Sequence, residues 1–221
     1  IRGEQLATRL SYFLWSTKPD AGLRKIGRSK ALDDPDHLAR IVRSMIEDPR
    51  AAALASNFAA QWLDLRKLDT LEPDTGAHPG ISRELFRSMR RATELLFDEL
   101  RTGEHRISHL LTADQTHVDA RLAEHYGIDG DFEPDEFVVV PSTDGRRGIL
   151  GHAGVLTLTS ESTRTSPVKR GKWILESLLD DAPPPPPPGA DSFEAGDEAL
   201  RDAASLREEL ARHREDPKCA I

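Results

Sequence analysis

The segment SRELFRSMRRATELLFDELR, residues 82–101, carries the longest helical pattern in this 221-residue chain. Its apolar residues recur at three- and four-residue intervals, which places them on one face of a 3.6-residue helix: Leu85, Met89, Ala92, Leu96 and Leu100. Ser82 precedes the pattern and suits an N-cap, because its hydroxyl can accept a hydrogen bond from a free backbone N–H of the first turn. The segment predicts a long helix with one face in the core.

Shorter apolar stripes of the same period lie on both sides of this helix, at residues 6–14, 38–46, 54–65, 107–111 and 118–126. Asp34-Pro35 precedes the second stripe and predicts a helix start, with Asp as the cap and Pro at the first helical position. Trp15, Trp62 and Trp173 lie on or beside helical stripes, and we expect them to pack in the core.

After Gly127 the pattern changes. The short β-branched run Phe137–Val140 predicts one strand, whereas the glycine-broken apolar segment 148–158 is compatible with helix or extended chain. Ser166-Pro167 predicts the start of another helix. Gly171 lies in its early turns, where glycine costs up to about 1 kcal/mol relative to alanine. We therefore expect another backbone to approach Gly171 closely.

Residues 183–188 are six consecutive prolines, which form an extended rod of about 19 Å, and residues 197–214 predict a final amphipathic helix. The expected fold class is thus mostly α: an irregular multi-helix domain with at most one or two short strands, then a polyproline spacer and a C-terminal helix. We predict two domains, a helical one over 1–140 and the start of a second over 141–221.

The composition of the chain argues against some classes of function. The chain is 38% hydrophobic and 31% charged, which suits a globular protein, and its net charge of −8 argues against general nucleic-acid binding. No apolar run approaches the roughly 20 residues of a membrane span. The first residue is Ile1 and no leader pattern follows it, so we expect both ends to lie inside a longer protein.

Positive charge is concentrated between residues 140 and 175, which hold six basic and two acidic residues. Arg164, Lys169 and Arg170 lie at the start of a predicted helix, where the free N–H groups already favour an anion. One interpretation is that these three side chains converge on a carboxylate or phosphate. The other is neutralisation by the chain's own acids, with Glu176 and the pair Asp180-Asp181 as candidates.

Known catalytic and metal-binding motifs say little about the function of this chain. The sequence contains no G-x-S-x-G, P-loop or H-E-x-x-H motif, so the catalytic residues stay unknown. His105 and His109 have a metal-ligand spacing, but no third ligand is suggested nearby, and we expect two solvated histidines and no metal site. Acidic groups are plentiful, and a hydrolase dyad could be drawn from them: Glu94, Asp98 and Glu99 on one helix, Glu72 and Asp74 in one loop.

The single cysteine lies in the sequence Asp216-Pro217-Lys218-Cys219-Ala220-Ile221. A cysteine followed by two residues matches the first three positions of C-x-x-C-H, the motif that attaches c-type haem. A lone cysteine is also commonly an ordinary small side chain. The cysteine alone leaves both interpretations open.

Six segments, in this order, give the chain a family resemblance: LSYFLWS (10–16), NFAAQWL (57–63), HYGI (125–128), RGIL (147–150), TRTSPVKRGKWILE (163–176) and HREDPKC (213–219). With them the chain resembles the large multidomain cytochrome-like proteins of planctomycetes and myxobacteria. It departs from them at Thr116-His117-Val118-Asp119, where the family more often has an aromatic residue and an Asn.

The resemblance implies an exported protein of the periplasm or cell envelope. It also implies that Cys219 is the first thiol of a c-type haem box, completed in the parent by Cys and His after Ile221. We expect no haem in this fragment itself. The implied partners are other domains of the same polypeptide and a redox partner, with no nucleic acid and no membrane span.

Three function classes follow. The first is a fragment of an exported c-type cytochrome-like protein with a redox or electron-transfer role. The second is a non-redox helical interaction or scaffold module of the cell envelope. The third is a carboxylate-dependent hydrolase. Whether the parent is an enzyme stays open.

Overall fold

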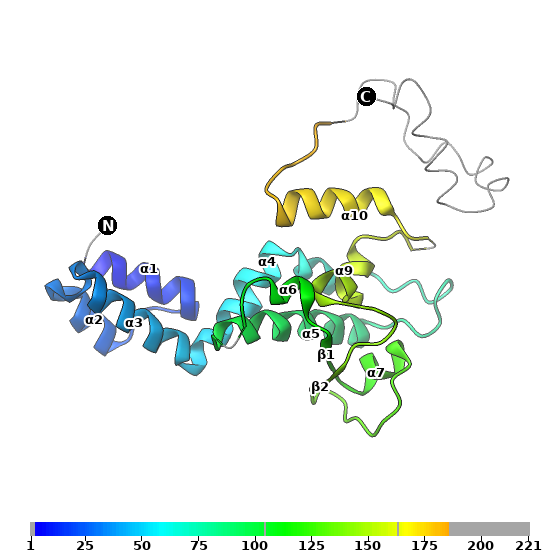
Figure 1. Ribbon diagram of the computed structural model, residues 1–221, viewed down its shortest axis with the longest axis horizontal. Coiled ribbons are helices and arrows are strands. Elements are labelled where there is room, and N and C mark those ends of the chain that lie inside the picture. Colours follow the sequence, from blue (N-terminus) through cyan, green and yellow to red (C-terminus); the bar gives the residue numbers. More distant parts are fainter. Residues whose placement is uncertain (1–2, 104, 163, 186–221) are drawn as a thin grey trace. The chain divides into compact units, whose positions relative to one another are not determined.

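The structure is a computed structural model that describes residues 3–103, 105–162 and 164–185 (Figure 1). It is about 60% helical, with one two-stranded sheet, which confirms the predicted mostly α class. The polyproline spacer is described only as far as residue 185, and the predicted helix at 197–214 and Cys219 lie outside the described residues. Among the helices described, none is long and apolar enough to cross a bilayer.

The elements follow one another along the chain with short connections. The α-helices are α1 (Glu4–Trp15), α2 (Ala21–Arg28), α3 (Pro35–Glu47), α4 (Ala60–Trp62), α5 (Arg83–Arg101), α6 (His109–Thr112), α7 (Ala120–Tyr126), α8 (Gly148–Gly151), α9 (Ala153–Leu158) and α10 (Pro167–Trp173). The 3₁₀ turns are η1 (Lys30–Asp33), η2 (Pro49–Ala51) and η4 (Leu65–Asp69), and the π-helical segments are η3 (Leu54–Ala59) and η5 (Ile174–Leu178). The strands are β1 (Gln115–Val118) and β2 (Val138–Pro141).

Helix α5 organises the main core. Figure 1 shows it among α4, α6, α9 and the two strands, and its predicted apolar stripe is buried at Leu85, Met89, Ala92 and Leu96. Apolar clusters lie against it on more than one side, so the helix is buried over more than the narrow stripe typical of a surface helix. The first three helices form a further apolar cluster around Leu14, Trp15 and Met45.

The predicted helix starts are confirmed. The carboxylate of Asp34 accepts from Asp36 N (3.2 Å), the hydroxyl of Ser82 from Leu85 N (3.0 Å), and that of Ser166 from Lys169 N (3.3 Å). Trp15 and Trp173 are buried, as expected, whereas Trp62 is only half-buried. Local capping signals were therefore dependable in this chain.

Other local predictions need correction. The stripe at 54–65 predicted one regular helix, but the segment passes through a π-helix and then a residue in left-handed conformation, Asp64 (φ 61°). Val118 was expected on a helix and instead ends strand β1. This strand pairs antiparallel with β2, which lies at 138–141, one residue later than the predicted strand Phe137–Val140. The segment 148–158 forms two short helices, α8 and α9, separated at His152, whose backbone is extended.

Two glycines of the C-terminal half, Gly148 and Gly171, differ in the space around them. A Cβ atom built on Gly171 would meet nothing within 4 Å, so the expected close approach at this position is wrong. The close approach occurs at Gly148, where a Cβ would lie 2.2 Å from Leu110 O and 2.6 Å from Leu111 C. Gly148 also has a φ of +48°, a conformation that favours glycine.

One compact unit runs from Ile1 to Asp180 and continues through the domain boundary expected at residue 140. Two indole groups hold its last helical segment in place. Trp62 Nε1 donates to Ser177 O (2.5 Å), and Trp173 Nε1 donates to Leu63 O (3.4 Å). Helix α10 and η5, which continue one another in Figure 1, are thereby fastened on the residues around α4.

Candidate functional site

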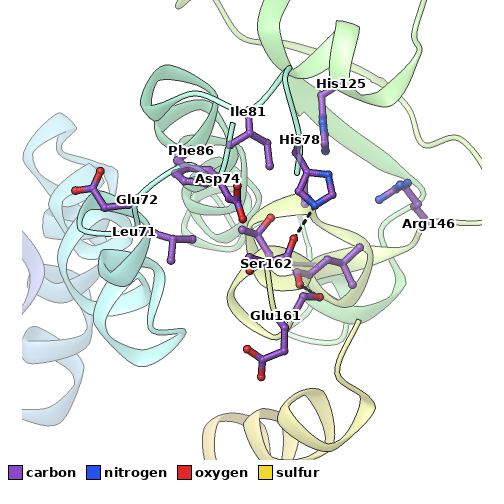
Figure 2. Close-up of a pocket in the computed structure, with 14 residues that line it drawn as sticks. Leu71, Glu72, Asp74, His78, Ile81, Phe86, His125, Arg146, Glu161 and Ser162 are labelled. Atoms are coloured by element: carbon purple, nitrogen blue, oxygen red, sulfur yellow. Dashed lines mark hydrogen bonds between the residues drawn. The ribbon is translucent and has the colours of Figure 1, made fainter. Parts of the chain in front are cut away.

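A cleft of about 280 Å³ lies between the loop that precedes α5, the end of α7, and helix α9 (Figure 2). Its apolar lining includes Leu71, Ile81 and Phe86, and its polar lining includes His78 and Arg146. The His78 ring is held by a hydrogen bond between Nε2 and Ser162 O (2.7 Å). The cleft is close to the size of small-molecule sites and combines an apolar wall with a few polar groups, as such sites do.

Three acids line this cleft, Glu72, Asp74 and Glu161, and the two that the sequence placed in one loop, Glu72 and Asp74, do not form a catalytic pair. Glu72 is ion-paired with Arg83, and Figure 2 shows its carboxylate turned away from Asp74. Asp74 accepts a hydrogen bond from Ala77 N (3.0 Å) and so stabilises its own loop. Paired carboxylates act in glycoside hydrolysis by facing one bond from two sides. The geometry of Glu72 and Asp74 does not provide that arrangement.

The acids of α5 are also engaged with cations. Glu94 contacts Arg90 (2.7 Å) and Arg91 (3.4 Å), and Asp98 contacts Arg101 (2.6 Å). In each contact a carboxylate is paired with an arginine three or four residues away on the same helix. The carboxylates that the sequence suggested for hydrolysis are thus structural in the described part of the chain, with Glu99 in a separate cluster of histidines.

Arg146 connects the cleft to a smaller cavity of about 10 Å³ and lines both. Its guanidinium lies 4.9 Å from the centre of the Tyr126 ring and donates to Gly151 O (3.2 Å). The Tyr126 hydroxyl accepts from Ala153 N (2.9 Å), and burial raises the pKa of this phenol. The cavity is about the size that one water molecule occupies.

His152 is the most strongly perturbed group of this region. It is buried, and burial lowers its pKa to about 4, with the charges of His117 and Arg146 acting in the same direction. The Thr93 hydroxyl lies 3.1 Å from Met89 O and forms a hydrogen bond with His152 Nδ1 (3.0 Å). The other ring nitrogen, Nε2, lacks a protein partner within the described residues, and His152 lines the small cavity.

A second group of histidines surrounds Glu99, in the last turns of α5. Glu99 Oε2 lies 2.9 Å from His109 Nε2, and Glu99 Oε1 lies 3.3 Å from His117 Nε2. His105, in the turn before α6, stacks on His109 with ring centres 3.8 Å apart and planes 7° apart. One ligand atom each of Glu99, His105 and His109 lies within 4.8 Å of the other two. Glu99 thus lies close enough to the histidine pair to act as a third ligand, which the sequence did not suggest, and the absence of a metal site stays a prediction.

The sequence missed Glu99 for a definable reason. His105 and His109 were placed on one predicted helix face, but α6 begins only at His109, so the turn between α5 and α6 brings the rings together. The same turn folds the end of α5 back on them. A glutamate ten residues before a histidine indicates a possible shared metal site only when the turn that brings the two side chains together is known.

The three basic candidates have different neighbours. Lys169 Nζ contacts Glu161 Oε1 (2.6 Å), and Arg170 Nε donates to the Thr159 hydroxyl (3.3 Å). Arg164 O accepts from Glu161 N (2.9 Å), and no side-chain partner of Arg164 is found among the described residues. The structure does not join the three to one acid, and Glu176 instead contacts Lys172 (3.6 Å). Anion binding by these residues stays a prediction.

Two family models match the chain. The model PSCyt3, described as a protein of unknown function (DUF1588), matches residues 146–221, the part that contains the basic helix and Cys219. The model PSD4, described as a protein of unknown function (DUF1592), matches residues 1–128. Both are of the cytochrome-like kind that the sequence resembles. No curated protein and no solved structure matches the chain. Because the PSD4 model covers more than half of the 221 residues, the chain belongs to the PSD4 (DUF1592) family.

Proposed function

We propose that this chain is part of an exported c-type cytochrome-like protein with an electron-transfer role, and that Cys219 supplies the first thiol of its haem-attachment motif. One observation carries the proposal. The PSCyt3 match runs from residue 146 to residue 221 and includes Asp216-Pro217-Lys218-Cys219-Ala220-Ile221, whose last three residues fit the first three positions of C-x-x-C-H.

The donor set in this chain is incomplete for such a haem. A c-type haem is held by two thioether bonds and a histidine ligand, whereas the chain contains one cysteine. The second thiol and the histidine would come from residues after Ile221 in the parent polypeptide. The residues present therefore do not hold a covalent haem by themselves.

In this proposal the compact unit is the domain that precedes the haem-bearing segment in the chain. Its last helical segment is fixed by the Trp62 and Trp173 hydrogen bonds, so the chain leaves the unit from a defined position. The prolines of 183–188 would act as a stiff spacer of about 19 Å, because proline residues hold an extended conformation. Other domains of the same polypeptide and a redox protein would be its partners.

The test is haem attachment to the parent polypeptide, expressed with a c-type haem maturation system. We expect Cys219→Ser to lose the haem that stays bound on a denaturing gel, with one haem fewer per polypeptide. Ala220→Ser is the matched control, because it changes a position where the motif accepts any residue, and it should keep that haem. The 221-residue chain alone should lack a Soret band. Unchanged haem content in Cys219→Ser would overturn the proposal.

One observation favours the second function class, an interaction module. Tyr12, Phe13 and Phe58 are exposed. The rings of Phe13 and Phe58 are 5.9 Å apart, and Phe58 lies 5.9 Å from the half-buried Trp62. Grouped exposed aromatic side chains are typical of protein interfaces. A Phe13→Ser, Phe58→Ser variant that no longer binds the parent's other domains in a pull-down would support this class. Unchanged binding would remove its support.

A further inference from the structure

We propose that Glu99, His105 and His109 bind one divalent transition-metal ion of the Zn²⁺ type, and that His117 positions the Glu99 carboxylate from the other side. This site is independent of the proposed haem function. It rests on the juxtaposition of three ligand atoms within 4.8 Å of one another, from the end of α5, the following turn and the start of α6.

The donor set has the right chemistry. Imidazole nitrogens and a carboxylate oxygen are regular ligands of Zn²⁺, with bonds of about 2.0–2.2 Å. Tetrahedral geometry with such bonds places neighbouring ligand atoms about 3.4 Å apart. Glu99 Oε2 and His109 Nε2 are 2.9 Å apart, and all three pairs lie within 4.8 Å. Shifts of about 1 Å in the side chains suffice to surround an ion.

The placement of the ligands makes this adjustment feasible. Glu99 belongs to the long core helix α5, and His109 is followed by Leu110, which is buried in the main core. These two ligands are held by packed elements. His105 is exposed in the turn, and its side chain is the one free to move onto an ion.

His117 completes the arrangement. Its Nε2 lies 3.3 Å from Glu99 Oε1, the oxygen not directed at His109, and its side chain is only 12% exposed. We infer that this contact restrains the orientation of the carboxylate, in the role that residues outside the ligand set commonly have at metal sites. With three protein ligands, the fourth position would be left for water or a small ligand, as in open zinc sites.

The test uses the untagged 221-residue chain, stripped with a chelator and titrated with ZnCl₂ in a calorimeter at pH 7.5. We expect one ion per chain. Each of His105→Ala, His109→Ala and Glu99→Gln should weaken the affinity at least tenfold, since even residues outside the ligand set change metal affinity by about 10–100-fold. His37→Ala is the matched control, because His37 lies on α3 beside Arg40 (3.4 Å), and it should bind as the unchanged chain does.

His117→Gln separates positioning from ligation. It should weaken Zn²⁺ binding by about 10–100-fold and yet leave the visible absorption of bound Co²⁺ with the pattern of four-coordinate geometry. His105 is exposed, so His105→Ala should keep the circular dichroism and melting temperature of the metal-free chain. The proposal is overturned if Zn²⁺ shows no saturable binding, or if His105→Ala and Glu99→Gln bind it as tightly as His37→Ala.

Discussion

Gly148→Ala is expected to be among the most damaging single-methyl additions in this chain. Gly148 begins α8, directly against α6, with a φ of +48°. A Cβ there would lie 2.2 Å from Leu110 O, 2.6 Å from Leu111 C and 2.7 Å from Leu111 Cα. All three atoms are backbone, so no side-chain rotation can make room. Gly148 N also donates to Ala113 O (2.8 Å), which limits any shift of the segment.

The magnitude follows from three contributions. A left-handed conformation costs a non-glycine residue about 1–2 kcal/mol, overpacking costs about 1–3 kcal/mol, and weakening the hydrogen bond costs about 1 kcal/mol. We expect a loss of about 3–6 kcal/mol in the free energy of unfolding. For a chain of this size, that corresponds to a fall of roughly 6–24 °C in melting temperature.

Gly171→Ala is the matched control, because the same methyl group is added to a glycine with free space around it. Gly171 lies within α10, where alanine is favoured over glycine by about 0.8–1.0 kcal/mol. The melting temperature should rise by roughly 2–4 °C. Calorimetry of the two variants beside the unchanged chain is the measurement. If Gly148→Ala melted within about 2 °C of the unchanged chain, the close approach of α8 to α6 would be refuted.

Two further predictions concern buried polar groups. His152 has a pKa of about 4 in the folded chain and about 6.5 when unfolded, so only the unfolded chain takes up its proton as pH falls from 6.5 to 4. Between pH 7 and 4.5 the free energy of unfolding should fall by about 2 kcal/mol more than in His152→Gln, as urea titrations can measure; equal pH dependence would contradict this. Asp119, which is fully buried, accepts from Leu122 N (3.0 Å) and from the Ser88 hydroxyl (2.6 Å). Asp119→Ala should therefore lose about 2–4 kcal/mol in the same assay, and Asp119→Asn clearly less, whereas equal losses would argue against a capping role.

The features that the sequence predicted correctly are those decided within a few residues. The stripe of α5 and the caps Asp34, Ser82 and Ser166 depend on neighbours within one or two turns. Strand β1 was not predicted, because it forms by pairing with residues 138–141, which lie 20 or more residues later in the chain. Backbone pairing at that distance leaves no local pattern beyond β-branched residues, and the two in Gln115–Val118, Thr116 and Val118, are too short a pattern to predict a strand.

For the candidate sites too, the sequence did not show the contacts that depend on residues from other segments. Arg164, Lys169 and Arg170 are close in sequence, yet their neighbours differ because Glu161 and Thr159 belong to a preceding segment that folds back beside α10. The Glu99 cluster shows the reverse, since Glu99 looked unrelated to the pair His105 and His109 and is brought to it by one turn. The sequence does not show that Gly148, and not Gly171, lies against another backbone, because packing against another backbone is a tertiary property.

The two indole hydrogen bonds have a consequence for how the chain is synthesised. Trp173 closes over Leu63, which leaves the ribosome 110 residues earlier. At roughly 5–20 residues per second, that interval lasts about 5–22 s. During this time the apolar faces of α4 and α5 are not yet packed against the helical segment that contains Trp173. The part matched by PSD4 therefore cannot finish folding before the first third of the part matched by PSCyt3 has emerged from the ribosome. A gene rearrangement that separated the two parts would thus yield a nascent chain prone to chaperone capture or aggregation.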